Sequence, residues 1–531
     1  MSLTRAVASW LLLHGLAHAA QTKSVAPLSI SPSKYWDGID GWWSTFNIAL
    51  GTPAQSVRLL PGTSNNQIWT ILPAGCAEDN ANLTLSACDI TRGNTFHRFH
   101  SSTWSTQELA TNKSITLIAP EEIALGLQHA GNYGFDAVTL GLLGSGSPAL
   151  QNQTIAGIWT VDFWLGNLGL SADPLYITSS VDAVASVLGT LHNLSLVPSM
   201  SWGYTAGAFY RNAAAFGSLT LGGYDSSRFT RNDASFDLRN STSRDLLLTL
   251  DSISHNATDS QPLLLGAPID VFIDSLVTEL YLPVTVCQAF ETAFGLQWDS
   301  TTERYLINET THNNLLVQNP TFNMTFSQPG NGTATILLPY AAFDLNATQP
   351  LVNTTSRYFP LKQAQNSTQY TLGRTFLQEA YIITDYERRN FSVYQAVSDG
   401  SPAQLVAINS PEPQAAKHRS GLTGGAIAGI VIAIIVALAL VVGAVFWFRR
   451  QWRLAIGDTI DEKHAETEQS SPVSRYEVDG GTGRHELSVQ EQRKAELDGS
   501  RQIKDRPLPA IKVHEMRANE TPAIDLEAVV R

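Results

Sequence analysis

A run of residues without a charged side chain, Gly424 to Phe448, sets the strongest limit on how this 531-residue chain folds. In hydrocarbon every backbone N–H and C=O group needs a partner within the protein, and a helix provides those partners inside a single segment. At about 1.5 Å per residue, the run is long enough to cross the roughly 30 Å core of a bilayer. We therefore predict a transmembrane helix at residues 424–448.

The residues that flank this run indicate its orientation. Arg449, Arg450 and Arg453 follow it at once, and basic residues on one flank favour the cytoplasmic side. We expect a single-pass type I membrane protein of the cell surface or vacuole, with its N-terminal bulk outside. Gly425 and Gly429 form one G-x-x-x-G, a spacing found in helix dimers and in single helices alike, so the oligomeric state stays open.

The N-terminus and the glycosylation acceptors agree with this topology. Residues 1–20 combine Arg5, an apolar run and a small-residue end, which predicts a signal peptide, with an ordinary buried helix as the alternative. Only Asn519 is an Asn-x-Ser/Thr acceptor after the span. We expect the acceptors that precede the span to be glycosylated. They are Asn82, Asn112, Asn152, Asn193, Asn240, Asn256, Asn308, Asn323, Asn331, Asn346, Asn353, Asn366 and Asn390.

The charge and the cysteines narrow the function class. A net charge of -13 without a basic patch argues against a nucleic-acid partner. In an oxidising compartment, Cys76 and Cys88 are predicted to form a disulfide worth about 3 kcal/mol. Cys287 is left over, and its apolar surroundings at helical spacing favour a buried free thiol over an intermolecular bridge or a nucleophile.

Residues 32–397 consist of short apolar runs separated by Gly, Asn, Ser and Pro, which is typical of many β-strands. Helical spacing occurs at Val181–Leu191 and Val284–Phe294. The fold class is therefore predicted to be mostly β with a few helices. The clearest strand candidates are Ser114–Ile118, Ala137–Gly141, Ser218–Gly222, Ala334–Leu338 and Ala380–Thr384.

Two segments of this region resemble each other. One leads from Gly51-Thr-Pro to Trp69, and the other leads from Phe272-Ile-Asp274-Ser to Tyr281-Leu-Pro. Each resembles an active-site segment of the pepsin-like aspartic peptidases, the peptidase A1 family, in which a hydrophobic pair precedes Asp-Thr/Ser-Gly. Counting from the flanking motifs places the second catalytic Asp at Asp274. The same count puts Gly62 where that family has its first catalytic Asp.

Further motifs extend the resemblance, in order, over nearly all of residues 32–397. It implies a bilobal pepsin-like fold, with an N-terminal lobe at 32–215, a C-terminal lobe at 216–397 and a substrate cleft between them. A stalk at 398–423 and a disordered cytoplasmic tail at 449–531 complete the predicted organisation. The additional similar segments are Gly131–Gly141, Asp162–Ser171, Gly217–Asp225 and Leu372–Leu377.

The chemistry of that family needs two carboxylates that share a proton, one as base toward water and one as acid toward the carbonyl. Asp274 is present, but Gly62 supplies no partner, and Asp270 lies more than about 10 Å away along its strand. We call the loops that begin at Gly62 and at Asp274 the first and the second tip. The second tip carries Leu276 and Val277 where the family has Gly and Thr, and residues 114–131 hold no flap Tyr. The resemblance places Thr63, Ser64, Ser275 and Thr278 at the substrate cleft.

Three readings of the exterior domain remain. The leading prediction is a catalytically inactive aspartic peptidase homologue that binds a peptide or protein, in which Asp274 serves mainly as a turn residue. The alternatives are an active aspartic endopeptidase with an unorthodox site and a structural surface glycoprotein with a closed cleft. The sequence has no H-E-x-x-H, C-x-x-C, G-x-S-x-G or phosphate-binding loop, so we expect no metal and no cofactor.

Overall fold

The structure is a computed structural model, and it divides the chain into two units, 1–418 and 419–531, which are considered separately. The predicted signal peptide and the acceptors Asn82, Asn112, Asn256 and Asn519 lie outside the described residues. The described residues are 25–77, 85–106, 115–127, 130–177, 183–211, 215–240, 244–255, 263–328, 330–411 and 424–457.

The first part of the chain forms an eight-stranded sheet around the segment that ends at Gly62. Trp69 is fully buried in it, as expected of a central strand that is covered on both faces. Its strands, in spatial order, are β2 (Pro32–Asp37), β3 (Trp43–Leu50), β4 (Gln55–Gly62), β9 (Gly166–Gly169), β5 (Ile68–Ile71), β8 (Ala149–Ile158), β7 (Ala130–Leu140) and β6 (Ile115–Thr116).

The second part forms a seven-stranded sheet with the same design. Phe322, Met324 and Phe326 alternate with partly exposed residues, so one face of this sheet is buried. Its strands, in order, are β21 (Thr333–Pro339), β20 (Thr321–Ser327), β15 (Leu247–His255), β16 (Ile269–Ile273), β25 (Thr371–Leu372), β17 (Leu280–Pro283) and β24 (Leu361–Ala364).

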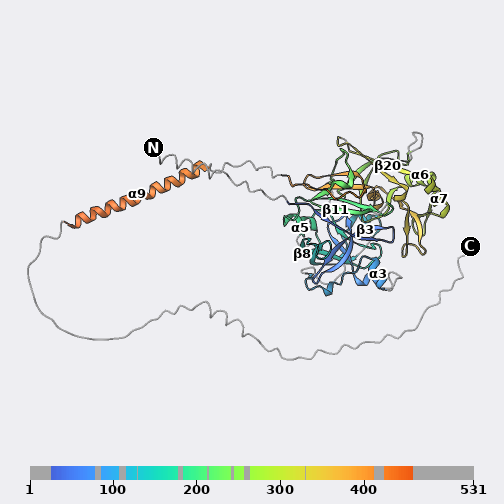
Figure 1. The fold of residues 1–531 in the computed structure, drawn as a ribbon, viewed down its shortest axis with the longest axis horizontal. Coiled ribbons are helices and arrows are strands. Elements are labelled where there is room, and N and C mark those ends of the chain that lie inside the picture. Colours follow the sequence, from blue (N-terminus) through green and yellow to red (C-terminus); the bar gives the residue numbers. More distant parts are fainter. Residues whose placement is uncertain are drawn as a thin grey trace, which may run out of the picture. The chain divides into compact units, whose positions relative to one another are not determined.

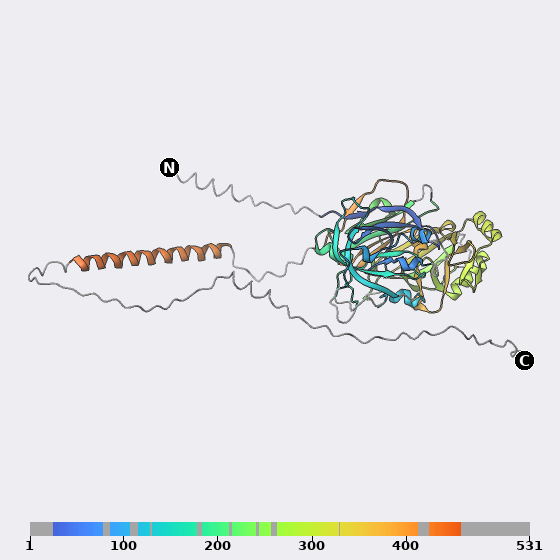
Figure 2. The same cartoon turned by 90° about the horizontal axis from the view of Figure 1, so that it is seen from below.

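The two sheets repeat one pairing pattern. In the first, β4 is parallel to β9, β9 is antiparallel to β5, and β5 is parallel to β8. In the second, β16, β25, β17 and β24 pair in the same parallel, antiparallel, parallel order. Figure 2 shows the blue and cyan strands at one side of this unit and the yellow-green elements at the other. The predicted mostly β, two-lobed architecture is confirmed.

A third sheet joins the two parts, because it takes strands from the beginning, middle and end of the unit (Figure 1). In order, these are β1 (Leu28–Ile30), β11 (Ala215–Leu221), β10 (Ser201–Ala208), β26 (Ala380–Asp385), β27 (Asn390–Ala396) and β13 (Phe229–Thr230), and β14 (Phe236–Asp237) also pairs with β27.

Two small sheets complete the strands. Because β12 (Gly223–Asp225) pairs with β28 (Leu405–Ala407), the folded part continues past Val397, where the stalk is predicted to begin. The other small sheet has the order β18 (Gln297–Asp299), β19 (Arg304–Leu306), β23 (Ser356–Phe359) and β22 (Leu345–Ala347).

The helices of the first unit are short. The helix predicted at Val284–Phe294 is present with those bounds, and it buries Cys287 and Phe290. It ends at Gly295, whose φ of 66° is the left-handed conformation that favours glycine after a helix. The helices are α3 (Leu85–Thr91), α4 (Pro120–Ala124), α5 (Val187–Asn193), α6 (Val284–Phe294), α7 (Glu309–Gln318) and α8 (Arg374–Leu377).

In the second unit, α9 (Gly424–Gly457) contains the predicted apolar run. Its stretch Ala433–Gln451 has a mean hydropathy of 2.0 and is long enough to cross a membrane. The helix continues beyond Phe448, the predicted end of the span, because nothing in the following arginine-rich turn breaks helical geometry. An apolar helix of spanning length is thus present, while the side of the membrane on which each terminus lies remains a prediction.

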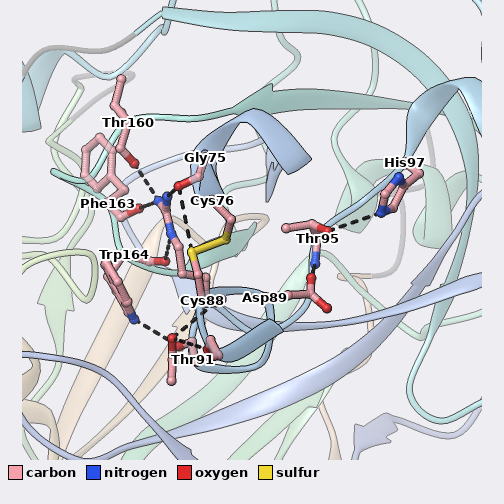
Figure 3. The surroundings of a disulfide bond; sticks show 12 residues. Gly75, Cys76, Cys88, Asp89, Thr91, Thr95, His97, Thr160, Phe163 and Trp164 are labelled. Atoms are coloured by element: carbon pink, nitrogen blue, oxygen red, sulfur yellow. Dashed lines mark hydrogen bonds between the residues drawn. A yellow bond between two sulfur atoms is a disulfide. The ribbon is translucent and has the colours of Figure 1, made fainter. Parts of the chain in front are cut away.

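The predicted disulfide is present, with Cys76 and Cys88 bonded at a Cα–Cα distance of 5.6 Å (Figure 3). Beside it lies Arg92, which is 0 % exposed and whose pKa burial lowers to about 10. This guanidinium ties the disulfide loop to the segment that enters β9, the neighbour of β4. It donates to the carbonyl oxygens of Gly75 (2.7 Å), Thr160 (2.5 Å), Phe163 (2.9 Å) and Trp164 (3.0 Å).

We predict that Arg92→Met lowers the free energy of unfolding by about 3 kcal/mol or more, because it leaves buried carbonyl oxygens without a donor. Arg98→Met is the control, since Arg98 lies over the Phe99 ring and is only partly buried. Denaturant unfolding of secreted residues 1–418 measures both. Equal effects of the two substitutions would contradict the assigned role of Arg92.

Candidate functional site

The loops that follow β4 and β16 hold each other through their hydroxyl residues. The Thr63 N–H donates to Ser275 Oγ at 2.9 Å, and the Ser275 N–H donates to Thr63 Oγ1 at 2.9 Å. The hydroxyls themselves donate across the pair, from Ser275 to the Pro61 carbonyl oxygen at 2.6 Å and from Thr63 to that of Ile273 at 3.2 Å. The residue after Gly62 is thereby fixed against the residue after Asp274.

Gly62 stands at the position predicted for the first catalytic carboxylate. Because it has no side chain, the amide groups of Asn65 and Asn167 lie close to its Cα atom. A Cβ atom added there would lie 3.2 Å from Asn167 Oδ1 and 3.4 Å from Asn65 Oδ1. The Nδ2 atoms of Asn65 and Asn167 and the Oδ1 atom of Asn167 are buried, and they find no hydrogen-bond partner among the described residues. The surroundings of Gly62 are therefore polar and incompletely satisfied, but they contain no carboxylate from this loop.

Asp274 is fully buried at the end of β16. Its Oδ1 atom accepts from the Leu276 N–H at 2.8 Å, which is the turn contact expected of this residue. Its Oδ2 atom finds no hydrogen-bond partner within the part of the chain that the structure describes. One carboxylate oxygen thus supports the loop, and the other is left in a space closed to solvent.

A second carboxyl group, which the sequence analysis missed, lies beside Asp274. Glu122 belongs to α4, in the stretch where the resemblance places a flap, and its Oε1 accepts from Ser64 Oγ at 2.6 Å. The residue is 1 % exposed. Glu121 and Glu122 are the only acidic residues between 114 and 131, so a search beyond the tip itself would have found the signal.

The two carboxyl groups influence each other's charge. Burial and the nearby Asp274 carboxylate raise the pKa of Glu122 to about 8. Burial also raises the pKa of Asp274 to about 6, against the opposing effects of the Leu276 N–H, the Ser64 hydroxyl and Arg374. The pair therefore keeps a proton at a higher pH than two free carboxyls would, as expected when two close carboxyls cannot both be charged.

Contacts from the C-terminal lobe hold α4 in place, and with it the Glu122 side chain. Glu121 forms an ion pair with Arg244 at 2.9 Å, and Gln369 Nε2 donates to the Ala124 carbonyl oxygen at 2.7 Å. On the other side, Gln67 Nε2 donates to the Ile118 carbonyl oxygen at 2.7 Å. The segment is therefore fixed from both sides, and it places Glu122 beside Asp274.

The residues of the second tip are also buried, whereas an open cleft would expose them to solvent. Leu276 is 9 % exposed and belongs to an apolar cluster with Trp69 and Phe163. The sequence predicted Thr63, Ser64, Ser275 and Thr278 as cleft residues, and all four are buried. Their role in binding a substrate remains a prediction.

Arg374 holds the second tip through hydrogen bonds to its backbone. It donates to the carbonyl oxygens of Ser275 at 2.9 Å and Leu276 at 2.8 Å, and to Asp40 Oδ2 at 2.8 Å. Thr278 Oγ1 donates to the same Asp40 oxygen at 2.5 Å. Asp40, in the β2–β3 turn, thus ties the first lobe to the second tip.

A cavity of about 480 Å³ remains beside the second tip. Its walls include Trp69, Phe163, Leu276, Thr278 and Arg374. Among the described residues that line it, neither Gly62 nor Asp274 appears. A bound side chain therefore has room beside Leu276 and Thr278 of the second tip.

Comparison with known proteins agrees with this architecture. The sequence profile that describes eukaryotic aspartyl proteases matches residues 45–396. Comparison with the curated proteins gives no match. The matched range contains both tips, α4 and the repeated strand pairings of the two lobes. Because the profile covers more than half of the chain, the chain belongs to the eukaryotic aspartyl protease family.

Proposed function

We propose that the chain is a membrane-anchored glycoprotein whose pepsin-like domain binds a peptide or protein without hydrolysing it. The observation that carries the proposal is the covered tip, in which Gly62 supplies no carboxylate and Asp274 is 0 % exposed beside Glu122 of α4. Hydrolysis by this family's chemistry needs two carboxyls that reach both a water and the scissile carbonyl. The cavity beside Leu276 supports binding of a side chain at the remaining space.

The rest of the chain supports export and anchoring. The apolar helix α9 suits a single span, and the arginines after it favour a cytoplasmic C-terminus. We expect the N-terminal domain to face the outside of the cell or the lumen of the vacuole. Several predicted acceptor asparagines that the structure describes are exposed, and they are Asn152, Asn193, Asn240, Asn308, Asn346, Asn353 and Asn366.

One observation favours an active endopeptidase as a second candidate. Glu122 places a carboxyl beside Asp274, and their pKa values are raised to different extents, as in an acid and base pair. Such a site would require α4 to move away, because both carboxyls are buried in the closed arrangement. The third candidate is a structural glycoprotein with a closed cleft. The covered tip agrees with it, and a cavity that binds no ligand would distinguish it from the proposed binding function.

We predict that secreted residues 1–418 do not cleave denatured protein at acid pH. Asp274→Asn and Glu122→Gln are the matched variants, and neither should change the background rate. Cleavage that a statine-type inhibitor blocks and that both substitutions abolish would overturn the proposal in favour of the Glu122–Asp274 pair. Loss of activity in Asp274→Asn alone would point to a different partner for the carboxylate.

Gly62→Asp is predicted to restore little hydrolysis, because α4 and Leu276 still fill the space above the tip. The substitution should also lower the unfolding free energy by about 1–3 kcal/mol, since the new Cβ lies within 3.2 Å of Asn167. Gly62→Asp with Asn167→Ala, which removes the amide next to the new Cβ, should recover part of the lost stability without recovering activity. Efficient turnover by either variant would show that the covered tip is not a barrier.

The raised pKa values predict that the domain loses stability as the pH rises from about 4.5 toward 8. In this window the folded protein keeps a proton on Glu122 that the unfolded chain has released. The loss is about 1.4 kcal/mol per pH unit for each such group at most.

Glu122→Gln should flatten this dependence, because the amide is neutral at every pH in the window. Glu309→Gln is the control, since the Glu309 side chain is 72 % exposed. The measurement is the unfolding free energy as a function of pH for the three proteins. Parallel curves for wild type and Glu122→Gln would contradict the assigned protonation.

A further inference from the structure

A second cavity, of about 540 Å³, lies between the β2–β3 turn and the loop that joins β22 to β23. Three tryptophans line it, Trp36, Trp42 and Trp164, together with Asn346 and Asn353. We call this cavity the tryptophan groove. Its lining combines flat aromatic faces with exposed amides and hydroxyls, so it is suited to a ligand that is apolar on its ring faces and polar at its edges.

The aromatic side of the groove is open to solvent. Trp42 is 48 % exposed and lies 5.7 Å, between ring centroids, from Phe209, which is 46 % exposed. Trp36 lies 5.3 Å from the same Phe209 ring. Large aromatic residues gathered at a surface generally mark a site that something covers.

The opposite side of the groove carries two glycosylation acceptors. Asn346-Ala-Thr348 and Asn353-Thr-Thr355 are both Asn-x-Thr sequences, and their asparagines and threonines all line the groove. Both asparagines are exposed, and neither side chain forms a hydrogen bond among the residues that the structure describes. By contrast, the acceptor Asn308 is already engaged, because its side chain accepts from the Thr311 N–H.

Of the two acceptors, Asn353 is the better placed for modification. It lies in the loop before β23, and Thr355 is exposed. Asn346 belongs to strand β22, and Thr348 N–H donates to the Ile39 carbonyl oxygen at 2.8 Å. An enzyme that must bind the acceptor in an accessible loop therefore finds it more readily at Asn353.

We infer that an N-linked glycan on Asn353 occupies the tryptophan groove and packs its first sugar rings against Trp42. The inference rests on the proposed export of this domain. In the modification, Asn353 Nδ2 forms a bond to the anomeric carbon of a lipid-linked oligosaccharide, the lipid diphosphate leaves, and the nitrogen loses one proton. The C–H faces of the sugar then meet the electron-rich face of the indole.

This glycan also connects to the site. The β2–β3 turn that carries Trp42 holds Asp40, which accepts from Arg374 and Thr278 of the second tip. Tyr358, on β23 beyond Asn353, donates its hydroxyl to the Asp40 carbonyl oxygen at 2.6 Å. A sugar that bridges Asn353 and Trp42 therefore fastens the same two elements that position the tip.

The test uses the full chain expressed in a eukaryotic secretory host, with mass spectrometry of each acceptor. Asn353 should be occupied in the wild type and in Thr355→Ser, which keeps the acceptor sequence, and unoccupied in Thr355→Ala. Enzymatic release of the Asn353 glycan from the folded protein should be roughly fivefold faster in Trp42→Ala, because the ring that shields it is gone. Release from Asn193, an exposed acceptor that is not among the residues lining the groove, should be unchanged.

Two results would overturn the inference while leaving the proposed function in place. One is an unoccupied Asn353 in a chain whose other acceptors carry glycans. The other is an occupied Asn353 whose glycan is released at the same rate in wild type and Trp42→Ala. A chain without any glycan would instead overturn the proposed export, and the inference with it.

Discussion

The reciprocal bonds between Thr63 and Ser275 are the interaction on which the rest of the site depends. They bring two loops more than two hundred residues apart into one fully buried contact. Because each backbone N–H is satisfied by the other loop's hydroxyl, the lobes cannot separate there without exposing buried polar groups. The residue before Thr63 is Gly62, which has no carboxylate, so the contact fixes the two loops whether or not both catalytic positions carry an acid.

The residues around Asp274 are buried with it, so solvent does not reach its carboxylate. Leu276 fills apolar space, and α4 brings Glu122 into the gap with Ser64 between the two acids. A buried pair of this kind is stable when it holds one proton, which ties the free energy of unfolding to pH. The result is a rigid tip with a neighbouring cavity, which suits recognition better than turnover.

Much of this could be predicted because it rests on local spacing. The helix α6 follows from apolar periodicity and the disulfide from two nearby cysteines, whereas the catalytic positions that counting assigns to Asp274 and Gly62 stay predictions. The sequence shows Glu122 as one of two acidic residues near the expected flap, but it does not show the contact with Ser64, because α4 has five residues and meets Ser64 across 58 positions of sequence. Which side chain fills a gap between lobes is decided by tertiary packing, and no local pattern encodes that choice.

The central claim is that α4 closes the space above Asp274, and carboxyl footprinting tests it most directly. Secreted residues 1–418 would be treated with a carbodiimide and an amine at mildly acid pH, and labelled carboxyls would be identified by mass spectrometry. The account predicts that Asp274 and Glu122 stay unlabelled, while Glu303, whose side chain is 74 % exposed, and Glu309 react readily. Labelling of Asp274 at a rate similar to that of Glu303 in the folded protein would contradict it.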